Sequence, residues 1–216
     1  MKSEIQQIEE LLGITLEKYD YKNKYQVNTY GTWTQLEGKK ELKLENINID
    51  DFKVLLPFTK NLHWLKLINC TIGSIYGLFD FENLCNLTLD NVDIQDLEKS
   101  YPNKICNTDY RGCLMEINLK NMNIQHLGAL QPMATSLVHV FITNCTLHNF
   151  YEVNLFPELY DLRLDNVSIQ KSKNDIVYPS NPDRNFTWLS LSNMKVEDID
   201  YFMPISQGVH GIRIYN

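Results

Sequence analysis

The feature that most constrains this chain is a short motif, apolar-x-apolar-x-Asn, that recurs along its length. It occurs eight times and ends at Asn46, Asn69, Asn91, Asn121, Asn144, Asn166, Asn193 and Asn216. Successive asparagines lie 23, 22, 30, 23, 22, 27 and 23 residues apart. The basic period is therefore 22 to 23 residues, with two longer repeats. A repeat of this length predicts a solenoid, in which each unit stacks on its neighbours.

Each copy of the motif predicts one short strand. Side chains alternate along an extended chain, so the two apolar residues of a copy point inward and the residues around them point outward. A lone strand cannot bury its apolar face, but stacked copies form one continuous core. We therefore expect eight parallel strands in one sheet. Three residues after each of the first seven asparagines stands another aliphatic residue that we expect to be buried: Ile49, Ile72, Ile94, Ile124, Leu147, Ile169 and Val196.

At these residues the sequence resembles the leucine-rich-repeat family, over residues 36–216. The resemblance implies an α/β solenoid, a horseshoe with a parallel β-sheet on its concave face and short helical segments on its convex side. One position departs from the family pattern. Where the family commonly has an inward-facing Asn or Cys, this chain has Ile47, Cys70, Val92, Met122, Cys145, Val167 and Met194. We predict an apolar ladder there, and we expect the asparagine one residue earlier to end each strand, because Asn tolerates unusual backbone dihedrals in turns.

Residues 1–35 predict a cap for the first end of the solenoid. Ser3 and Gln6 have the spacing of a capping box, and Gly13 is placed to end a helix over residues 3–12. The residues expected on its apolar face are Ile5, Ile8, Leu11 and Leu12. We expect the helix to cover the core, with a partner-binding or membrane-surface helix as the alternative. Residues 14–33 are rich in Tyr and Thr and predict irregular strands that extend the cap.

The repeats end on a truncated copy, because the eighth motif stops at Asn216. We expect Gly211 to Tyr215 to form an edge strand that needs protection by twist, by Arg213 or by another chain, and a homodimer through this edge is possible. The two long repeats contain insertions at Glu98 to Cys113 and Gln170 to Asn185. We expect surface loops there, with a second binding surface as the alternative.

Composition narrows the class of function. The net charge of -7 disfavours nucleic acid as a partner, since nucleic-acid binders usually carry a clustered basic face. The first residues lack the apolar stretch of a signal peptide, and no segment approaches the roughly 18 apolar residues of a membrane span. We therefore expect a cytoplasmic protein without a membrane partner. The five cysteines are odd in number and irregularly spaced, which favours reduced thiols over a disulfide framework.

Motifs of catalysis and cofactor binding are missing from the sequence. It contains no GxxxxGK[ST], no strand-following GxGxxG, no HExxH and no CxxC. Its five histidines are spread over different repeats, so we expect no metal ligation. We predict a protein that is not an enzyme and that uses no cofactor.

The outward residues of the strands are the most informative for function. Several are large and apolar, which on an exposed sheet face needs an explanation. Aromatic residues mixed with Arg are typical of the anchors of protein interfaces. We therefore predict that a protein partner binds the concave face at Trp64, Lys66, Ile68, Phe141, Asp161, Arg163, Trp188, Arg213 and Tyr215. Coverage of these side chains by the protein's own loops is the alternative.

The resulting prediction is a non-enzymatic protein-protein interaction module. Its most concrete form is a cytosolic inhibitor or immunity-type protein, since some families of that kind resemble small acidic repeat proteins. The alternative is a secreted or host-directed effector or adhesin with leucine-rich repeats.

Overall fold

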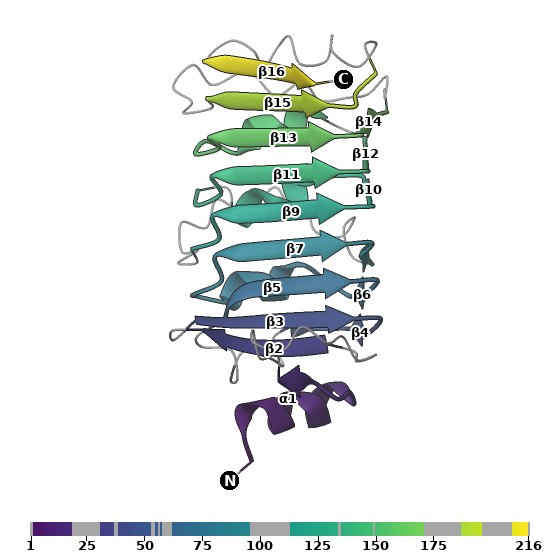
Figure 1. Ribbon diagram of the computed structural model, residues 1–216, viewed down its shortest axis with the longest axis vertical. Helices are drawn as coiled ribbons and strands as arrows, with labels where there is room; N and C mark the ends of the chain where they lie inside the picture. Colours follow the sequence, from purple (N-terminus) through teal and green to yellow (C-terminus); the bar gives the residue numbers. More distant parts are fainter. Residues whose placement is uncertain are drawn as a thin grey trace.

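The chain folds into a single stack of strands that forms a ten-stranded sheet. We describe a computed structural model, in which the described residues are 2–18, 31–36, 39–52, 55, 57, 62–95, 113–133, 135–148, 150–170, 187–195 and 209–215. The eight repeat motifs supply the strands β3 (Lys39–Glu45), β5 (Leu62–Ile68), β7 (Asn86–Asp90), β9 (Glu116–Lys120), β11 (His139–Thr143), β13 (Asp161–Asp165), β15 (Trp188–Ser192) and β16 (Gly211–Tyr215). Each pairs in parallel with the next, so the predicted sheet of eight parallel strands is confirmed (Figure 1).

An asparagine ends each of the first seven motif strands, as predicted. These asparagines have φ angles between 51° and 56°, in the left-handed region that few residue types other than Gly and Asn adopt. After each of the first six of these asparagines the chain turns into a two-residue strand. Three of these short strands, β4 (Asn48–Ile49), β6 (Thr71–Ile72) and β8 (Asp93–Ile94), form one small sheet, and the next three form another, β10 (Asn123–Ile124), β12 (Thr146–Leu147) and β14 (Ser168–Ile169).

The turn asparagines also form a ladder along this edge of the main sheet. Within runs of regular repeats each side-chain amide donates to the preceding asparagine, as from Asn91 Nδ2 to Asn69 Oδ1 at 2.9 Å. At the two long repeats the acceptor is instead a carboxylate: Asn121 donates to Asp90 at 2.6 Å and Asn193 to Asp165 at 2.7 Å. The asparagines, which we expected only to form turns, thus also link successive repeats through exposed side-chain hydrogen bonds.

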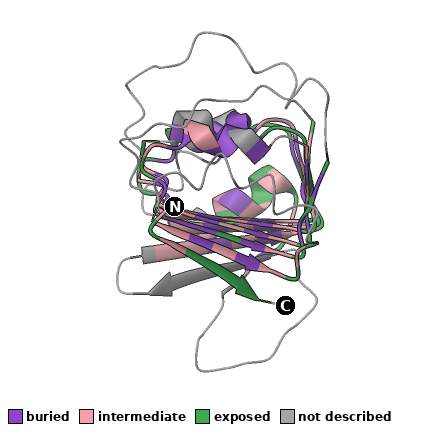
Figure 2. Ribbon diagram, turned by 90° about the horizontal axis from the view of Figure 1, so that it is seen from above, coloured by how far each residue is buried: buried purple, intermediate pink, exposed green. Residues whose placement is uncertain are grey.

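Short 3-10 helices close the side opposite the main sheet (Figure 2). They are η2 (Tyr76–Asp80), η4 (Leu127–Met133) and η5 (Phe150–Leu155). Between them and the sheet lies one continuous core. The inward aliphatic residues of β3 to β15 are at most 3% exposed, which confirms the predicted inward register.

The second set of core positions is confirmed with one correction. Five of the residues that stand three after an asparagine are buried, but Ile94 is only half-buried. Ile94 lies on the last strand of its small sheet, at the 30-residue repeat, and lines a small opening with Leu119 and Ile124, which leaves part of its side chain accessible. In the predicted apolar ladder five residues are buried, and Met122 and Met194 are half-buried against the core. Val196 and residues 98–112 and 171–186 of the two insertions lie outside the described residues.

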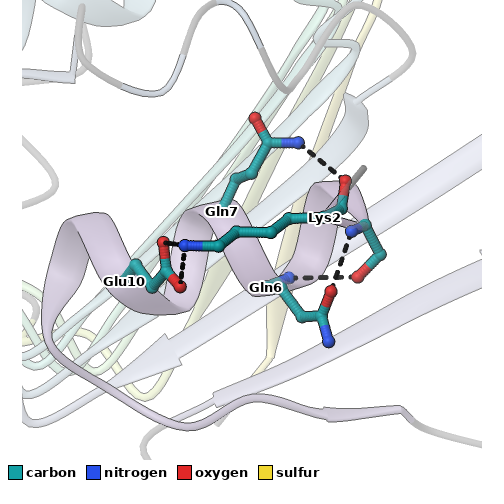
Figure 3. A network of polar contacts seen from close by, with 5 residues as sticks. Lys2, Gln6, Gln7 and Glu10 are labelled. Carbon is teal, nitrogen blue, oxygen red and sulfur yellow. Dashed lines mark hydrogen bonds and ion pairs between the residues drawn. The ribbon is translucent and has the colours of Figure 1, made fainter.

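The predicted N-terminal helix is present as α1 (Glu4–Leu12). Ser3 and Gln6 form both hydrogen bonds of a capping box at the start of the helix (Figure 3). Gly13 ends the helix in the left-handed conformation. Ile8 is fully buried in the core, whereas Leu11 is exposed, which corrects its predicted place on the apolar face. Lys2 forms an ion pair with Glu10 across the exposed side of the helix, so the helix presents its polar side outward.

Two strands connect this helix to the repeats. β1 (Glu17–Lys18) pairs in parallel with β2 (Gly31–Leu36), and β2 is antiparallel to β3. The expected extra strands of the cap therefore exist, and they join the main sheet.

At the opposite end, β16 is the edge strand that the sequence predicts. Ile212 and Ile214 stand in its inward positions but are 48% and 53% exposed. Among the described residues no strand pairs with the outer side of β16.

Candidate functional site

The outward face of the main sheet carries the nine predicted interface residues in two separate groups. Trp64, Lys66 and Ile68 lie on β5. The other six lie on four consecutive strands, β11, β13, β15 and β16: Phe141, Asp161, Arg163, Trp188, Arg213 and Tyr215. The strands between the groups, β7 and β9, present polar residues outward: Asn86, Thr88, Asp90, Glu116, Asn118 and Lys120. We call the second group, together with His139 and Tyr160, the aromatic–arginine cluster.

Trp188 is held in place by three neighbours. Its ring lies over Gly211 of the next strand, where a Cβ atom would come within 2.2 Å of Cζ3 of the ring. Its Nε1 donates a hydrogen bond of 3.3 Å to the hydroxyl of Tyr160. The guanidinium carbon of Arg213 lies 4.5 Å from the ring centroid, within the range of a cation–π contact. The indole is therefore pre-positioned on the face of the sheet.

Phe141 has a comparable set of contacts on β11. The guanidinium carbon of Arg163 lies 4.9 Å from the Phe141 ring centroid. The ring of His139 stacks beside Phe141 with the centroids 6.2 Å apart, and Tyr160 meets His139 edge-on. Two aromatic rings, each next to an arginine, thus lie on strands separated only by β13.

Asp161 forms an ion pair that positions Arg163. Its Oδ2 accepts hydrogen bonds from Nε and Nη2 of Arg163 at 2.9 and 2.6 Å. These bonds raise the pKa of Arg163 above its ordinary value, so the guanidinium stays charged. Asp161 points outward as predicted but is only 6% exposed, which leaves Arg163 as the exposed member of the pair.

Two buried polar atoms of the cluster lack a hydrogen-bond partner among the described residues. They are Nδ1 of His139 and Oδ1 of Asp161, which belong to directly opposed residues on β11 and β13. An unsatisfied buried polar atom costs roughly 1–3 kcal/mol.

An open depression of about 420 Å³ lies beside these residues on β11 to β16. Phe141 and Tyr215 line it with apolar surface, and Arg163 and Arg213 bring positive charge. Ser190 and Ser192 of β15 lie between the two arginine strands and add hydroxyl groups. This combination suits one or two side chains of a folded partner, with an anionic group near the arginines and an apolar group near the rings.

Trp64, Lys66 and Ile68 do not join this arrangement. All three side chains are half-buried, and Trp64 contacts the ring of His63 with the centroids 6.0 Å apart. Five strand spacings separate β5 from β15, or roughly 24 Å at about 4.8 Å each. A standard interface is wide enough to cover both groups.

Tyr160 and Gly211 contribute to the cluster but were not predicted from the sequence. Tyr160 stands one residue before its strand, so it is not one of the outward strand residues. Gly211 is an outward strand residue, but it has no side chain that would suggest a role in binding. The signal for Gly211 was its place directly beside Trp188 in the register, where a glycine leaves room for a large ring.

Other kinds of site are not evident in the described part of the chain. It holds no cluster of three or more His, Cys, Asp or Glu side chains arranged around a metal position. Nor does any of its helices have the length and apolar character needed to cross a membrane. His126 and His148 make separate contacts: His126 lies 3.2 Å from buried Glu152, and His148 lies 2.7 Å from Asn123.

Parallel strands from 22- to 23-residue units, asparagine turns and short helices on the opposite side define the structure as a leucine-rich-repeat solenoid. No protein-family model and no curated protein matches the chain. Among solved structures, an internalin (inlF) from Listeria monocytogenes is similar, with 18% identity, a TM-score of 0.47, and coverage of 82% of this chain and 59% of that one. An internalin C2 from the same organism matches with 15% identity and a TM-score of 0.37, over 81% of this chain and 80% of that one. These likenesses concern the fold alone.

Proposed function

We propose that this protein is a non-enzymatic binding module whose protein partner docks on the aromatic–arginine cluster. The observation that carries the proposal is Trp188, a large ring on the outer face of the sheet that is fixed by Gly211, Tyr160 and Arg213. Aromatic and arginine side chains supply most of the affinity in many interfaces. A ring that is already fixed loses little conformational entropy when a partner covers it.

The charges of the cluster define the partner's chemistry. Asp161 accompanies Arg163, but no carboxylate among the described residues forms an ion pair with Arg213. A carboxylate of the partner would supply that counter-charge, while an apolar side chain next to it would cover Trp188. The expected partner surface is therefore an apolar patch with acidic residues at its rim.

In its more specific form the proposal is a cytosolic inhibitor or immunity-type protein that covers part of its partner. The acidic net charge of -7 and the absence of catalytic motifs in the sequence support a role by binding alone. The native location of the protein tests this form. Recovery from the cytoplasm together with the partner supports it, whereas recovery from the cell surface or the medium favours a secreted effector or adhesin.

Binding by purified variants tests the proposed surface. After a partner is identified by affinity capture from the native lysate, its affinity is measured for the wild type and for Phe141→Ala and Trp188→Ala. At least one of these should lose about 2 kcal/mol or more of binding free energy, roughly thirty-fold in affinity. Thr88→Ala, on the polar strand β7 of the same face, is the matched control and should bind normally.

Trp64→Ala decides how far the interface extends. A loss of affinity in this variant as well means that the partner spans both groups on the sheet. Normal affinity in all three aromatic variants would place the binding surface elsewhere on the molecule and contradict the proposal.

A further inference from the structure

Two cysteines from neighbouring repeats lie in direct contact. The Sγ atoms of Cys85 and Cys113 are 2.9 Å apart, and both residues are half-buried free thiols. Cys85 directly precedes β7, and Cys113 stands shortly before β9, the next strand of the sheet. The contact therefore crosses the 30-residue repeat at the edge where the strands begin.

The main chain holds the two segments together. The carbonyl oxygen of Cys85 accepts hydrogen bonds from the backbone N–H groups of Met115 and Glu116 at 2.9 and 3.1 Å. These bonds continue the pairing of β7 with β9. The parallel sheet thus brings the two backbones together and places the sulfur atoms within reach of each other.

The other two described cysteines differ in their surroundings. Cys70 and Cys145 are buried, and their thiols donate to backbone carbonyls, at 3.2 Å in each case to the residue two positions earlier. Burial raises the pKa of both thiols. They belong to the apolar ladder of the core, and neither has a second sulfur within contact distance among the described residues.

We propose that Cys85 and Cys113 are a redox pair that forms an intramolecular disulfide on exchange with a low-molecular-weight disulfide. One cysteine thiolate attacks a sulfur of the small disulfide, forms a mixed disulfide and releases one small thiolate. The second cysteine sulfur then attacks the first, forms the Sγ–Sγ bond and releases the other small thiolate. The protein loses two electrons and two protons, and the small disulfide becomes two thiols.

The bond would join the start of β7 to the segment that leads into β9. The closed loop contains β7, β8 and the inserted residues 98–112. It would therefore fix the base of the longest repeat covalently. Burial and the hydrogen bond with Cys85 raise the pKa of Cys113 to about 11, so the thiolate fraction of Cys113 is small at neutral pH and oxidation should accelerate as the pH rises.

A redox pair at Cys85 and Cys113 departs from the expectation that all five thiols are reduced, and it does not depend on the proposed binding function. The odd number and irregular spacing of the cysteines do not reveal this pair, because the insertion places Cys85 and Cys113 28 positions apart in the sequence. In a reducing compartment both remain thiols, and in an oxidising one they are joined.

Oxidation of the purified full-length protein tests the pair. The reduced protein is incubated with mixtures of reduced and oxidised glutathione, quenched with acid, alkylated and mapped by mass spectrometry. We expect two of the five thiols to be lost, and a linked peptide pair that contains Cys85 and Cys113. The linkage should persist in Cys106→Ser and disappear in Cys85→Ser, with normal folding of each variant checked by circular dichroism.

Two results would overturn the inference. One is stable glutathione adducts on Cys85 and Cys113 in the wild type, without a bond between them. The other is a linkage of either residue to Cys106. Partner binding should be equal for the oxidised and reduced protein, because the pair lies at the strand-start edge of β7 and β9 and outside the aromatic–arginine cluster.

Discussion

Because Trp188 packs over Gly211, we expect Gly211→Ala to destabilise the protein when the indole is present and to stabilise it when Trp188 is replaced by alanine. In Gly211→Ala, the new Cβ would lie 2.2 Å from Cζ3 and 2.6 Å from Cε3 of the indole. Ordinary contacts at such a position begin near 3.4 Å, so the ring must move by about 1 Å or more. Gly211 does not have the positive φ that would itself disfavour alanine, so the ring alone opposes the substitution.

The magnitude follows from the contacts that the displaced ring would lose. The cation–π contact with Arg213 contributes about 0.5–1 kcal/mol, and the hydrogen bond to Tyr160 contributes about 0.5–1.5 kcal/mol. Alanine in place of glycine within a strand regains about 0.5–1 kcal/mol of conformational free energy. We expect Gly211→Ala to lower the free energy of unfolding by about 1 kcal/mol net, from the balance of these contributions.

A double-mutant cycle isolates the contribution of the ring. Free energies of unfolding are measured by urea denaturation for the wild type, Gly211→Ala, Trp188→Ala and the double variant. Without the indole, Gly211→Ala should stabilise by about 0.5 kcal/mol, so the substitution changes sign between the two backgrounds. Destabilisation by the same amount in both backgrounds would refute the packing of Trp188 on Gly211.

Three further substitutions or treatments test the core, the open edge and the cysteine pair. Leu89→Ala, at a fully buried inward position, should lower the free energy of unfolding by about 2–5 kcal/mol in urea denaturation, and a cost below about 0.5 kcal/mol would contradict the inward register. If β16 pairs with a second copy, light scattering should show a dimer at high concentration that Ile214→Lys disrupts, whereas a wild type that stays monomeric contradicts edge pairing. The Cys85–Cys113 bond closes a loop of 28 residues and should raise the free energy of unfolding by about 3.5 kcal/mol when oxidised and reduced protein are compared in urea, with Cys85→Ser unaffected by oxidation.

The repeated core was predictable because one physical rule decides it at every copy. Alternation along an extended strand separates inward from outward residues, and eight copies in register leave no competing arrangement that buries Leu42 and Leu189 together. The asparagine turns were predictable for a similar reason, since residue type and left-handed conformation are directly linked. The exceptions were Ile94 and, in the last copy, Ile212 and Ile214. The sequence shows that an insertion follows Ile94, but not that the small sheet stops there, and among the described residues no strand covers the outer side of β16.

For the candidate interface, the sequence predicted only which strand residues point outward. Strand register places Phe141, Arg163 and Arg213 on the outer face, and the structure agrees. Which of these side chains contact each other depends on their rotamers and on residues outside the strands, such as Tyr160. The burial of Asp161 beneath Arg163 is likewise a property of packed side chains, which alternation alone does not describe.

The outer face of the sheet is polar on β7 and β9 and aromatic on β11 to β16, and this contrast is possible because outward residues do not determine the fold. Stacking requires only that inward residues be apolar, so the outward positions of each repeat are free to vary without loss of the fold. On β7 and β9 they are polar and form local contacts such as the hydrogen bond from Asn118 to Glu116 at 2.8 Å. On β11 to β16 they are aromatic rings held by arginines, with two buried polar atoms left unpaired among the described residues. These outward rings and arginines lie outside the core cluster, and the proposed partner-binding surface rests on them.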